Sequence, residues 1–382
     1  MKRFFVQFLT ATISVLLLAI RVPAVAEDGF EPMFNGKDLT GWVLTNTPPE
    51  TWTFQDDLLV CTGKPIGEIR TEKMYQNFIM ELEWRHMVPR GNAGVFVWAD
   101  DITARGVPFH RGIEVQVLEN AYGNTQSYTT HGDIFPIHGA KMTPVNGRGG
   151  NRAFPTEMRS NPSPQWNHYR IECRDGEISL AVNGKVVTRG TEASPSKGYI
   201  CLESEGGVVH YRNIRIKTLP DTDIATEQIA IANRGYESLY TGLNLKGWAP
   251  PSDSDRWKVN DWTLSHTSPA DQTSQLVSEK KFDPIGFVID VRLKDESSKA
   301  SIAVGEQRTV DLADPEIAKH LQKNGQWNRL EWTQVDGKRV LIVNGQTTDV
   351  SQSPVSGTLT LVASGNVDFC NIYARSIAEP KP

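Results

Sequence analysis

The chain has 382 residues, with 45 acidic against 40 basic side chains and a formal net charge of −5. This length is too great for one ordinary domain and suits two domains, each with its own core. The acidic balance argues against nucleic acid or an anionic membrane surface as the partner.

The first 26 residues have the layout of a secretory signal peptide. Two basic residues precede an apolar stretch (4–20), and an Ala-Val-Ala site ends at residue 26. We expect cleavage there, with a membrane anchor as the alternative. Because three basic residues leave with the peptide, the formal charge becomes −8. The mature protein is expected to be periplasmic or secreted and to have no membrane segment.

The remaining sequence contains an internal repeat. "GFEPMFNGKDLTGW" (29–42) returns as "GYESLYTGLNLKGW" (235–248), and "QWNHYRIECRDGEISLAVNGK" (165–185) returns as "QWNRLEWTQVDGKRVLIVNGQ" (326–346). We therefore predict two related domains, 27–219 and 234–378, joined by a linker at 220–233 that begins with Pro220.

Each copy has the pattern of short strands. "FIMELEWR" (78–85) alternates apolar and polar residues, and "EISLAVNGKVV" (177–187) turns at Asn183-Gly184, a strong hairpin signal. No long segment combines a helical period with caps, so the sequence predicts an all-β chain of two tandem jelly-roll or β-sandwich domains.

The two copies differ in the middle. From Trp42 to Trp166 the first copy spans 124 residues, whereas from Trp248 to Trp327 the second spans 79. The 45 extra residues come from the middle of the first copy, where "GIEVQVLEN" (112–120) and a loop (121–165) lie. We expect this loop to form an ordered rim over one face of the sandwich.

Glu114 and Gln116 share one face of their strand, because Ile113, Val115 and Val117 must share the other. A merely solvated face is the alternative interpretation. Aligning "FIMELEWR" with "FVIDVRLK" (287–294) places Arg292 at the position of Glu83, and nothing in the second copy reproduces Glu-x-Gln.

Other candidates are less specific. His131 and His138 lie in a loop without the spacing of metal ligands, and they could be proton donors, sugar contacts or surface residues. Trp98 has no counterpart in the second copy and is a candidate sugar-stacking platform, whereas the tryptophans of "GW" and "QWN" are expected in the cores. The four cysteines show no metal-binding or redox spacing, so no metal site is predicted.

Several segments together resemble the 3-keto-disaccharide hydrolase family. They are "MFNGKDLTGW" (33–42), "GNAGVFV" (91–97), "EVQVLE" (114–119), "QWN" (165–167) and "YRNIRIKTL" (211–219), in order over residues 29–219. The second copy keeps only the ends. The resemblance implies concanavalin A-like jelly rolls and an exported enzyme for 3-keto-glycosides, carbohydrates that a partner dehydrogenase has oxidised at C3.

A ketone at C3 acidifies the C2 proton, so the glycosidic bond can leave by β-elimination before water adds. Such a route needs a base over C2, donors for the enolate oxygen and an acid for the leaving oxygen. We expect Glu114 as base, Glu83 as its alternative or as the acid, and His131 as a proton donor.

The remaining candidates would bind the substrate. Gln116, Arg85 and Asn92 would donate to the keto oxygen or hydroxyls, and Trp98 and His138 would contact the sugar. No nucleotide or redox cofactor is implied, although an acidic site is compatible with a divalent ion. The alternatives are a non-catalytic, lectin-like carbohydrate-binding protein and a structural adhesion protein.

Overall fold

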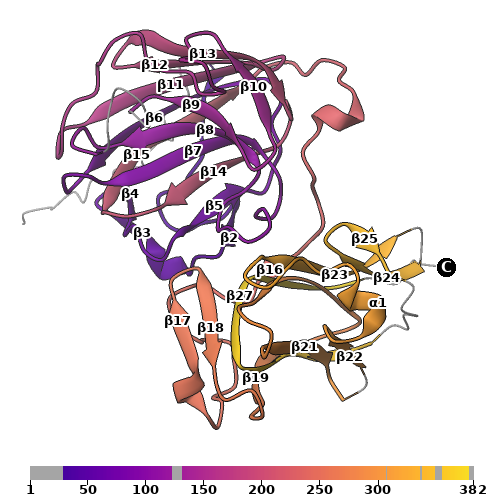
Figure 1. Ribbon diagram of the computed structural model, residues 1–382. Coiled ribbons are helices and arrows are strands. Elements are labelled where there is room, and N and C mark those ends of the chain that lie inside the picture. Colours follow the sequence, from indigo (N-terminus) through magenta and orange to yellow (C-terminus); the bar gives the residue numbers. More distant parts are fainter. Residues whose placement is uncertain (1–28, 123–130, 307, 336–337, 349–354, 378–382) are drawn as a thin grey trace, which may run out of the picture.

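The computed structural model describes residues 29–122, 131–306, 308–335, 338–348 and 355–377. The expected signal peptide lies outside these residues. The described chain forms two β-sandwiches and holds one short α-helix, α1 (Pro315–Ala318) (Figure 1). Within the described residues no helix is long and apolar enough to span a membrane.

The first sandwich pairs a nine-stranded sheet with a six-stranded sheet. In spatial order the nine-stranded sheet contains β10 (Lys141–Pro144), β13 (Lys185–Ser194), β12 (Glu177–Val182), β11 (Asn167–Arg174), β6 (Phe78–His86), β15 (Val209–Thr218), β4 (Leu58–Cys61) and β3 (Trp52–Gln55), with β1 (Glu31–Pro32) on β15. The six-stranded sheet contains β2 (Trp42–Thr45), β5 (Gly67–Thr71), β14 (Tyr199–Ser204), β7 (Asn92–Ala99), β8 (Gly112–Leu118) and β9 (Ile134–Ile137).

The second sandwich pairs an eight-stranded sheet with a four-stranded one. The eight-stranded sheet contains β17 (Trp257–Asn260), β18 (Thr263–Thr267), β27 (Asn366–Ser376), β20 (Ile285–Leu293), β23 (Asn328–Val335), β24 (Lys338–Val343) and β25 (Gln346–Thr347), with β16 (Glu237–Ser238) on β27. The four-stranded sheet contains β19 (Ser274–Phe282), β26 (Gly357–Ser364), β21 (Lys299–Val304) and β22 (Arg308–Asp311).

The larger sheets of the two sandwiches have the same strand order. The order β3-β4-β15-β6-β11-β12-β13 of the first corresponds to β17-β18-β27-β20-β23-β24-β25 of the second. The pairing registers correct our alignment of β6 with β20. His168 on β11 faces Glu83, whereas Arg329, which takes the position of His168 after the "QWN" motif, faces Asp290. Asp290, and not Arg292, therefore stands where Glu83 stands.

Period-two alternation positions the first core as predicted. Met80, Leu82 and Trp84 of β6 point inward and meet Val115 and Val117 of β8 from the opposite sheet. The inserted middle segment is more regular than a rim, because β9 extends the six-stranded sheet beyond β8 and β10 extends the nine-stranded sheet beyond β13. Its residues 123–130 lie outside the described chain.

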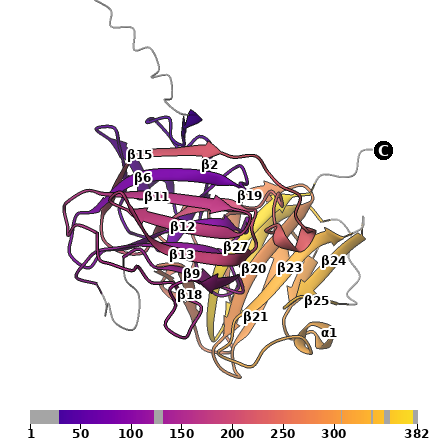
Figure 2. The same ribbon diagram turned by 90° about the horizontal axis from the view of Figure 1, so that it is seen from above.

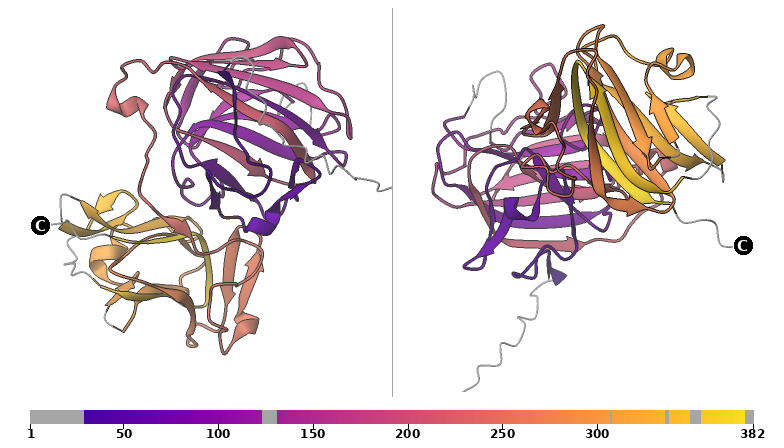
Figure 3. Two further views of the ribbon diagram at one scale, coloured as in Figure 1. Left: turned by 180° about the vertical axis from the view of Figure 1, so that it is seen from behind. Right: turned by 90° about the horizontal axis from the view of Figure 1, so that it is seen from below.

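The two sandwiches lie against each other, with the larger sheet of the second facing the loops of the first (Figures 2 and 3). The linker follows the first sandwich in extended form, apart from a single 3-10 turn at Thr226–Gln228, before it enters the second (Figure 1). Ala230 donates to Lys197 O and Asp101 donates to Ile231 O, so the linker is held along the first sandwich.

Candidate functional site

The outer face of the six-stranded sheet carries four acidic side chains, which we call the acidic cluster: Glu68 on β5, Glu114 on β8, Glu203 on β14 and Glu205 just after β14. Each points away from the core because an inward-facing residue precedes or follows it along the strand. The face is not solvated, since Glu68, Glu114 and Glu203 are only 0%, 6% and 1% exposed. Its apolar part is covered by Phe109, Ile137 and Ala232.

Gly94 lets two members of the acidic cluster meet. It lies on β7, between β14 and β8. A Cβ atom at Gly94 would lie 2.9 Å from Glu203 Oε2 and 3.0 Å from Glu114 Oε1. The two carboxyl groups therefore reach over this glycine from neighbouring strands on either side and lie close together.

This arrangement raises the pKa of three of these acids, Glu114, Glu203 and Glu205. Burial raises the pKa of Glu114 and Glu203 well above 4.5, and the negative charge of Glu205 adds to the effect at both. For Glu114 the guanidinium of Arg152 opposes the shift. Burial also raises the pKa of Glu205, to about 7, although a hydrogen bond from Asn92 opposes it. Glu205 is therefore partly protonated near neutral pH, and the surroundings of Glu114 and Glu203 also favour the protonated form.

Two amides adjoin these carboxyl groups. Gln116 Nε2 donates to Asn92 Oδ1 over 2.8 Å, and Asn92 Nδ2 donates to the carboxyl group of Glu205. Both amide side chains are nearly inaccessible to solvent. Glu203 Oε2 is buried without a hydrogen-bond partner among the described residues, so one acceptor in the cluster stays available for a ligand.

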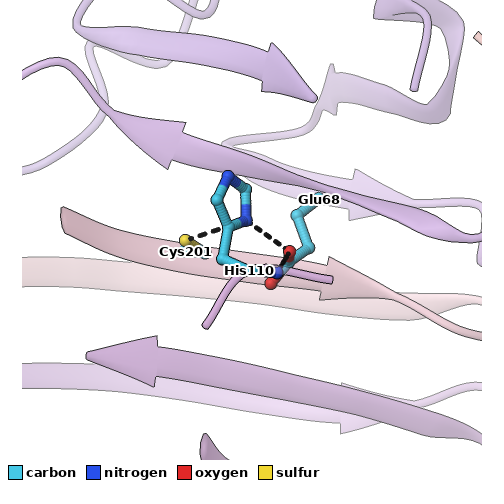
Figure 4. Close-up of side chains that lie close together, drawn as sticks. All are labelled: Glu68, His110 and Cys201. Carbon is cyan, nitrogen blue, oxygen red and sulfur yellow. Dashed lines mark hydrogen bonds and ion pairs between the residues drawn. The ribbon is translucent and has the colours of Figure 1, made fainter. Parts of the chain in front are cut away.

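Glu68 also orients a histidine (Figure 4). Its Oε2 accepts from His110 Nδ1 at 2.5 Å and from the His110 backbone N at 2.8 Å. This contact assigns the imidazole proton to Nδ1 and leaves a lone pair on Nε2, which is buried without a partner within the described chain.

Cys201 completes a possible metal-binding group. Its Sγ lies 3.6 Å from His110 Nδ1, and one ligand atom each from Glu68, His110 and Cys201 lie within 4.8 Å of one another. Carboxylate, imidazole and thiolate are donors that suit zinc. Burial, however, raises the pKa of Cys201 well above 9, which favours the neutral thiol. The sequence spacing could not indicate this group, because 91 residues separate His110 from Cys201.

The structure brings together several of the residues selected from the sequence. Glu114, Gln116 and Asn92 lie on one buried face. His138 follows β9 at the exposed rim, where partial burial lowers its pKa and the charges of Glu68 and His110 act on it. The positions of these residues are consistent with a single site on the six-stranded sheet.

Glu83 and Arg85 do not belong to that site. Both lie on the outer face of the nine-stranded sheet, and the core separates them from Glu114. Glu83 binds Arg212, and the Arg85 guanidinium lies 4.5 Å from the centre of the Trp166 ring. The expectation that Glu83 acts beside Glu114 is therefore corrected: alternation gives the face of a strand but not the sheet to which it belongs.

Trp98 is a core residue and not a sugar-stacking platform. At Trp98 φ is +54°, where the pairing of β7 with β14 is irregular, and the irregularity turns the side chain inward. The side chain is fully buried, and its Nε1 donates to Gln76 O over 2.9 Å. Trp166, which we expected in the core, is instead half-exposed beside two guanidinium groups.

Within the described chain, no hydrogen bond or ion pair joins His131 to the acidic cluster. Its Nε2 is 3.1 Å from Met158 Sδ, and the charge that acts on it is that of Glu119. Burial lowers its pKa to about 4, so the ring is neutral at neutral pH. A neutral, buried imidazole in contact with a thioether is poorly suited to the proton-donor role expected for it.

Sequence reasoning missed several residues of this face. In "YICLESE" (199–205) the alternation of Cys201, Glu203 and Glu205 was the signal that could have identified two of the acids. Arg152 binds Asp133 at 3.1 Å, and its guanidinium lies 3.4 Å from the Phe135 ring centre. His110 precedes β8 in a loop, where no periodic pattern could mark it.

Comparison with known proteins gives one family and several similar structures. Residues 29–217 match the family described as the 3-keto-alpha-glucoside-1,2-lyase-like domain. No curated protein sequence matches the chain. Two crystal structures from Parabacteroides distasonis, provisionally assigned as glycosyl hydrolases, are 24% and 25% identical and cover 50% of this chain, with 94% and 99% of their own chains and TM-scores of 0.40 and 0.39. A carbohydrate binding module from Bacillus subtilis is 11% identical, covering 47% of this chain and 96% of its own at a TM-score of 0.33.

Proposed function

Because residues 29–217 belong to the 3-keto-alpha-glucoside-1,2-lyase-like family, we propose that this protein cleaves 3-keto-glycosides by β-elimination followed by hydration. One observation carries the proposal: Glu114 and Glu203 lie together over Gly94, buried and with raised pKa values. When two neighbouring carboxyl groups cannot both ionise freely, one can stay protonated and act as an acid while the other is ionised and acts as a base.

The reaction needs one proton removed and one delivered. A carboxylate takes the hydrogen from C2, and the electron pair forms the C1–C2 double bond while the bond from C1 to the aglycone oxygen breaks. A carboxylic acid protonates that oxygen. Water then adds at C1 and a proton returns to C2, which gives the free 3-keto sugar. No oxidant or reductant is consumed.

The surroundings of the two carboxyl groups support a division of the two roles. Arg152 lowers the pKa of Glu114 against the effect of burial, which favours its ionised form, so Glu114 is the base. Burial and the neighbouring acids raise the pKa of Glu203, and one of its oxygens has no partner among the described residues, so Glu203 is the acid. Gln116 shares the strand face of Glu114, and its amide would donate to the oxygen at C3 by exchanging its present bond to Asn92 Oδ1 or Ala93 O.

The place of action belongs to the same proposal. Cleavage after residue 26 would export the protein to the periplasm or the medium, and a separate dehydrogenase would supply sugars oxidised at C3. Mass spectrometry of the protein recovered from its native cells would test the first part, because export with processing predicts an N-terminus at residue 27 and a precursor-length chain argues against it.

The activity is tested with a 3-keto-glucoside that carries a chromogenic aglycone, beside the same glucoside without the ketone. Release from the keto sugar alone is expected. Binding of either sugar without release would favour the lectin-like alternative, since recognition does not require carboxyl groups with raised pKa values. Release from both sugars would contradict the elimination route.

A further inference from the structure

Loop 100–111 connects β7 to β8 and reaches from the acidic cluster to the second sandwich. Its two arms pair with each other, because Thr103 and His110 form a bridge and Ala104 N donates to Phe109 O over 2.8 Å. The arm that returns to β8 carries His110, which binds Glu68. The tip, residues 104–107, points away from that contact and toward the second sandwich.

Asn371 of β27 binds the tip directly. Its Nδ2 donates to Ala104 O over 2.9 Å and to Val107 O over 3.0 Å, while its Oδ1 accepts from Asn46 Nδ2 at 2.8 Å. Asn371 is 1% exposed. One buried side chain of the second sandwich thus donates to carbonyl groups at both ends of the loop tip, and its Nδ2 also donates to Asp290 Oδ2 over 2.7 Å. Ala104 O accepts from Val107 N as well, so the contact with Val107 O depends most on Asn371.

An ion pair of the second sandwich binds the same loop. Asp290 Oδ2 accepts from Gly106 N at 2.8 Å, and Arg329 Nη2 donates to Thr103 O over 2.9 Å. Arg329 and Asp290 also bind each other at 2.7 and 2.8 Å. The Thr103 hydroxyl lies 2.8 Å from Tyr373 OH. Asp290 and Thr103 are both fully buried, so these contacts are shielded from water.

Packing is equally close at the tip. Gly106 has φ +72°, and a Cβ atom there would lie 2.4 Å from the Trp327 ring. That ring also lies 4.4 Å from the Arg292 guanidinium and 6.0 Å from the centre of the Trp262 ring. Only a residue without a side chain fits between the loop and the second sandwich at this point.

Within the described chain, the first sandwich shows the same sheet face without a docked loop. Glu83 takes the position of Asp290, and Asn213 takes that of Asn371 at the same irregularity of the strand pairing. Asn213 has φ +52° and Asn371 has φ +49°, yet Asn213 is exposed. The repeat therefore supplies an undocked copy of the surface for comparison.

We infer that the second sandwich is a clamp for loop 100–111, and that this clamp keeps His110 hydrogen-bonded to Glu68 beside the acidic cluster. Asp290, Arg329 and Asn371 are positioning residues in this account, because they touch the loop and not the cluster. The inference stands apart from the proposed reaction, since it rests only on these contacts.

Asn371→Gly in the full chain tests the clamp. Glycine accepts the positive φ, so the change removes the side chain without adding backbone strain. We expect backbone amides of residues 102–110 to exchange hydrogen about tenfold faster, because the loop tip loses its two hydrogen bonds from Asn371. Asn213→Gly, the same change on the undocked face, should leave their exchange unchanged.

The His110 imidazole provides the second readout. Its Nδ1 proton, held by Glu68, should give a slowly exchanging signal in nitrogen-edited NMR of the wild-type protein, and that signal should weaken in Asn371→Gly and persist in Asn213→Gly. This measurement needs no substrate, so it decides on the clamp whether or not 3-keto-glycosides are cleaved.

A variant on the loop side guards against misfolding of the second sandwich. Thr103→Val leaves the sequence of β20, β23 and β27 unaltered and removes only the contact with Tyr373 OH. It should also speed up amide exchange in residues 102–110, as Asn371→Gly does. If β20 and β27 lose protection in Asn371→Gly, Thr103→Val decides alone. The inference would be overturned if, in the variant that decides, the amides of residues 102–110 exchange at the wild-type rate and the His110 signal is unchanged.

Discussion

Glu114 is the side chain on which the proposed chemistry depends most. Burial and the neighbouring acids hold its pKa high, whereas Arg152 keeps the ionised form accessible. A carboxylate whose pKa lies above that of a solvated carboxylic acid is a stronger base. It removes a carbon-bound proton more effectively than an ordinary, solvated carboxylate.

Replacing this base gives the first prediction. Glu114→Gln keeps the shape of the side chain and removes its basicity, so turnover of a 3-keto-glycoside should fall by about 10²- to 10⁴-fold. Glu83→Gln, the same change on the opposite sheet, should keep wild-type turnover. Steady-state rates with matched circular dichroism spectra check both, and equal losses in the two variants would contradict the placement of the site.

Glu205 links this site to the stability of the fold. Its pKa rises from 4.5 to about 7 on folding, so folding favours its protonated form. The resulting stabilisation is present in full below pH 4.5 and is lost as the pH rises through about 7. The free energy of unfolding should therefore decrease with pH in this window, with a slope of at most about 1.4 kcal/mol per pH unit for one proton.

Urea titrations at several pH values measure that slope. Glu205→Gln should flatten it, because the amide does not titrate. Glu114 and Glu203 contribute with the same sign, so some decrease should remain. A slope in Glu205→Gln as steep as that of the wild type would show that Glu205 is ionised in the folded protein well below pH 7.

At the scale of elements, β7 separates the two strands that supply the carboxyl pair. Gly94→Ala places a methyl group about 3 Å from both Glu203 and Glu114, so the carboxyl groups must move apart. We expect a loss of turnover of about tenfold or more, since misplacement by about 1 Å can cost 10²-fold in a positioned reaction. Gly150→Ala, which meets open space, is the control for the same chemical change. Full activity of Gly94→Ala would remove the close pair from the mechanism.

Alternation predicted what lies within a strand but not what lies between strands. It correctly placed Glu114 on the other face of its strand from Val115, and Glu83 on the other face of its strand from Leu82. Which sheet each strand joins depends on pairings across more than 80 residues, such as that of β6 with β11, and no local pattern encodes them. Trp98 shows a second limit, because one residue at positive φ reverses the direction that alternation predicts.

At the scale of the whole molecule, the repeat predicted two sandwiches but not how they dock. The docked face of the second sandwich differs from its counterpart in the first mainly by what covers it: Trp327 meets Gly106, whereas Trp166 meets two arginine side chains. Such a difference depends on the path of loop 100–111 and the linker in space. Residues 1–28 lie outside the described chain, so export stays a prediction.

The interface predicts that the two sandwiches unfold together. Separation would expose an apolar cluster of Ile102, Tyr236, Val288 and Tyr373, together with the buried Asp290 and Asn371. Pulsed hydrogen exchange along a urea titration should therefore give one midpoint for strands of both sandwiches. Two separated midpoints would mean that the interface contributes little to stability.

The central claim is that the glycosidic bond breaks by removal of the C2 hydrogen. The most direct measurement uses a 3-keto-glucoside labelled with deuterium at C2, with the label followed in the released sugar at short times and corrected for exchange without enzyme. Elimination and hydration through Glu114 and Glu203 predict a product that carries solvent hydrogen at C2. A product that retains its deuterium would show that the C2 bond was never broken, and it would contradict the account.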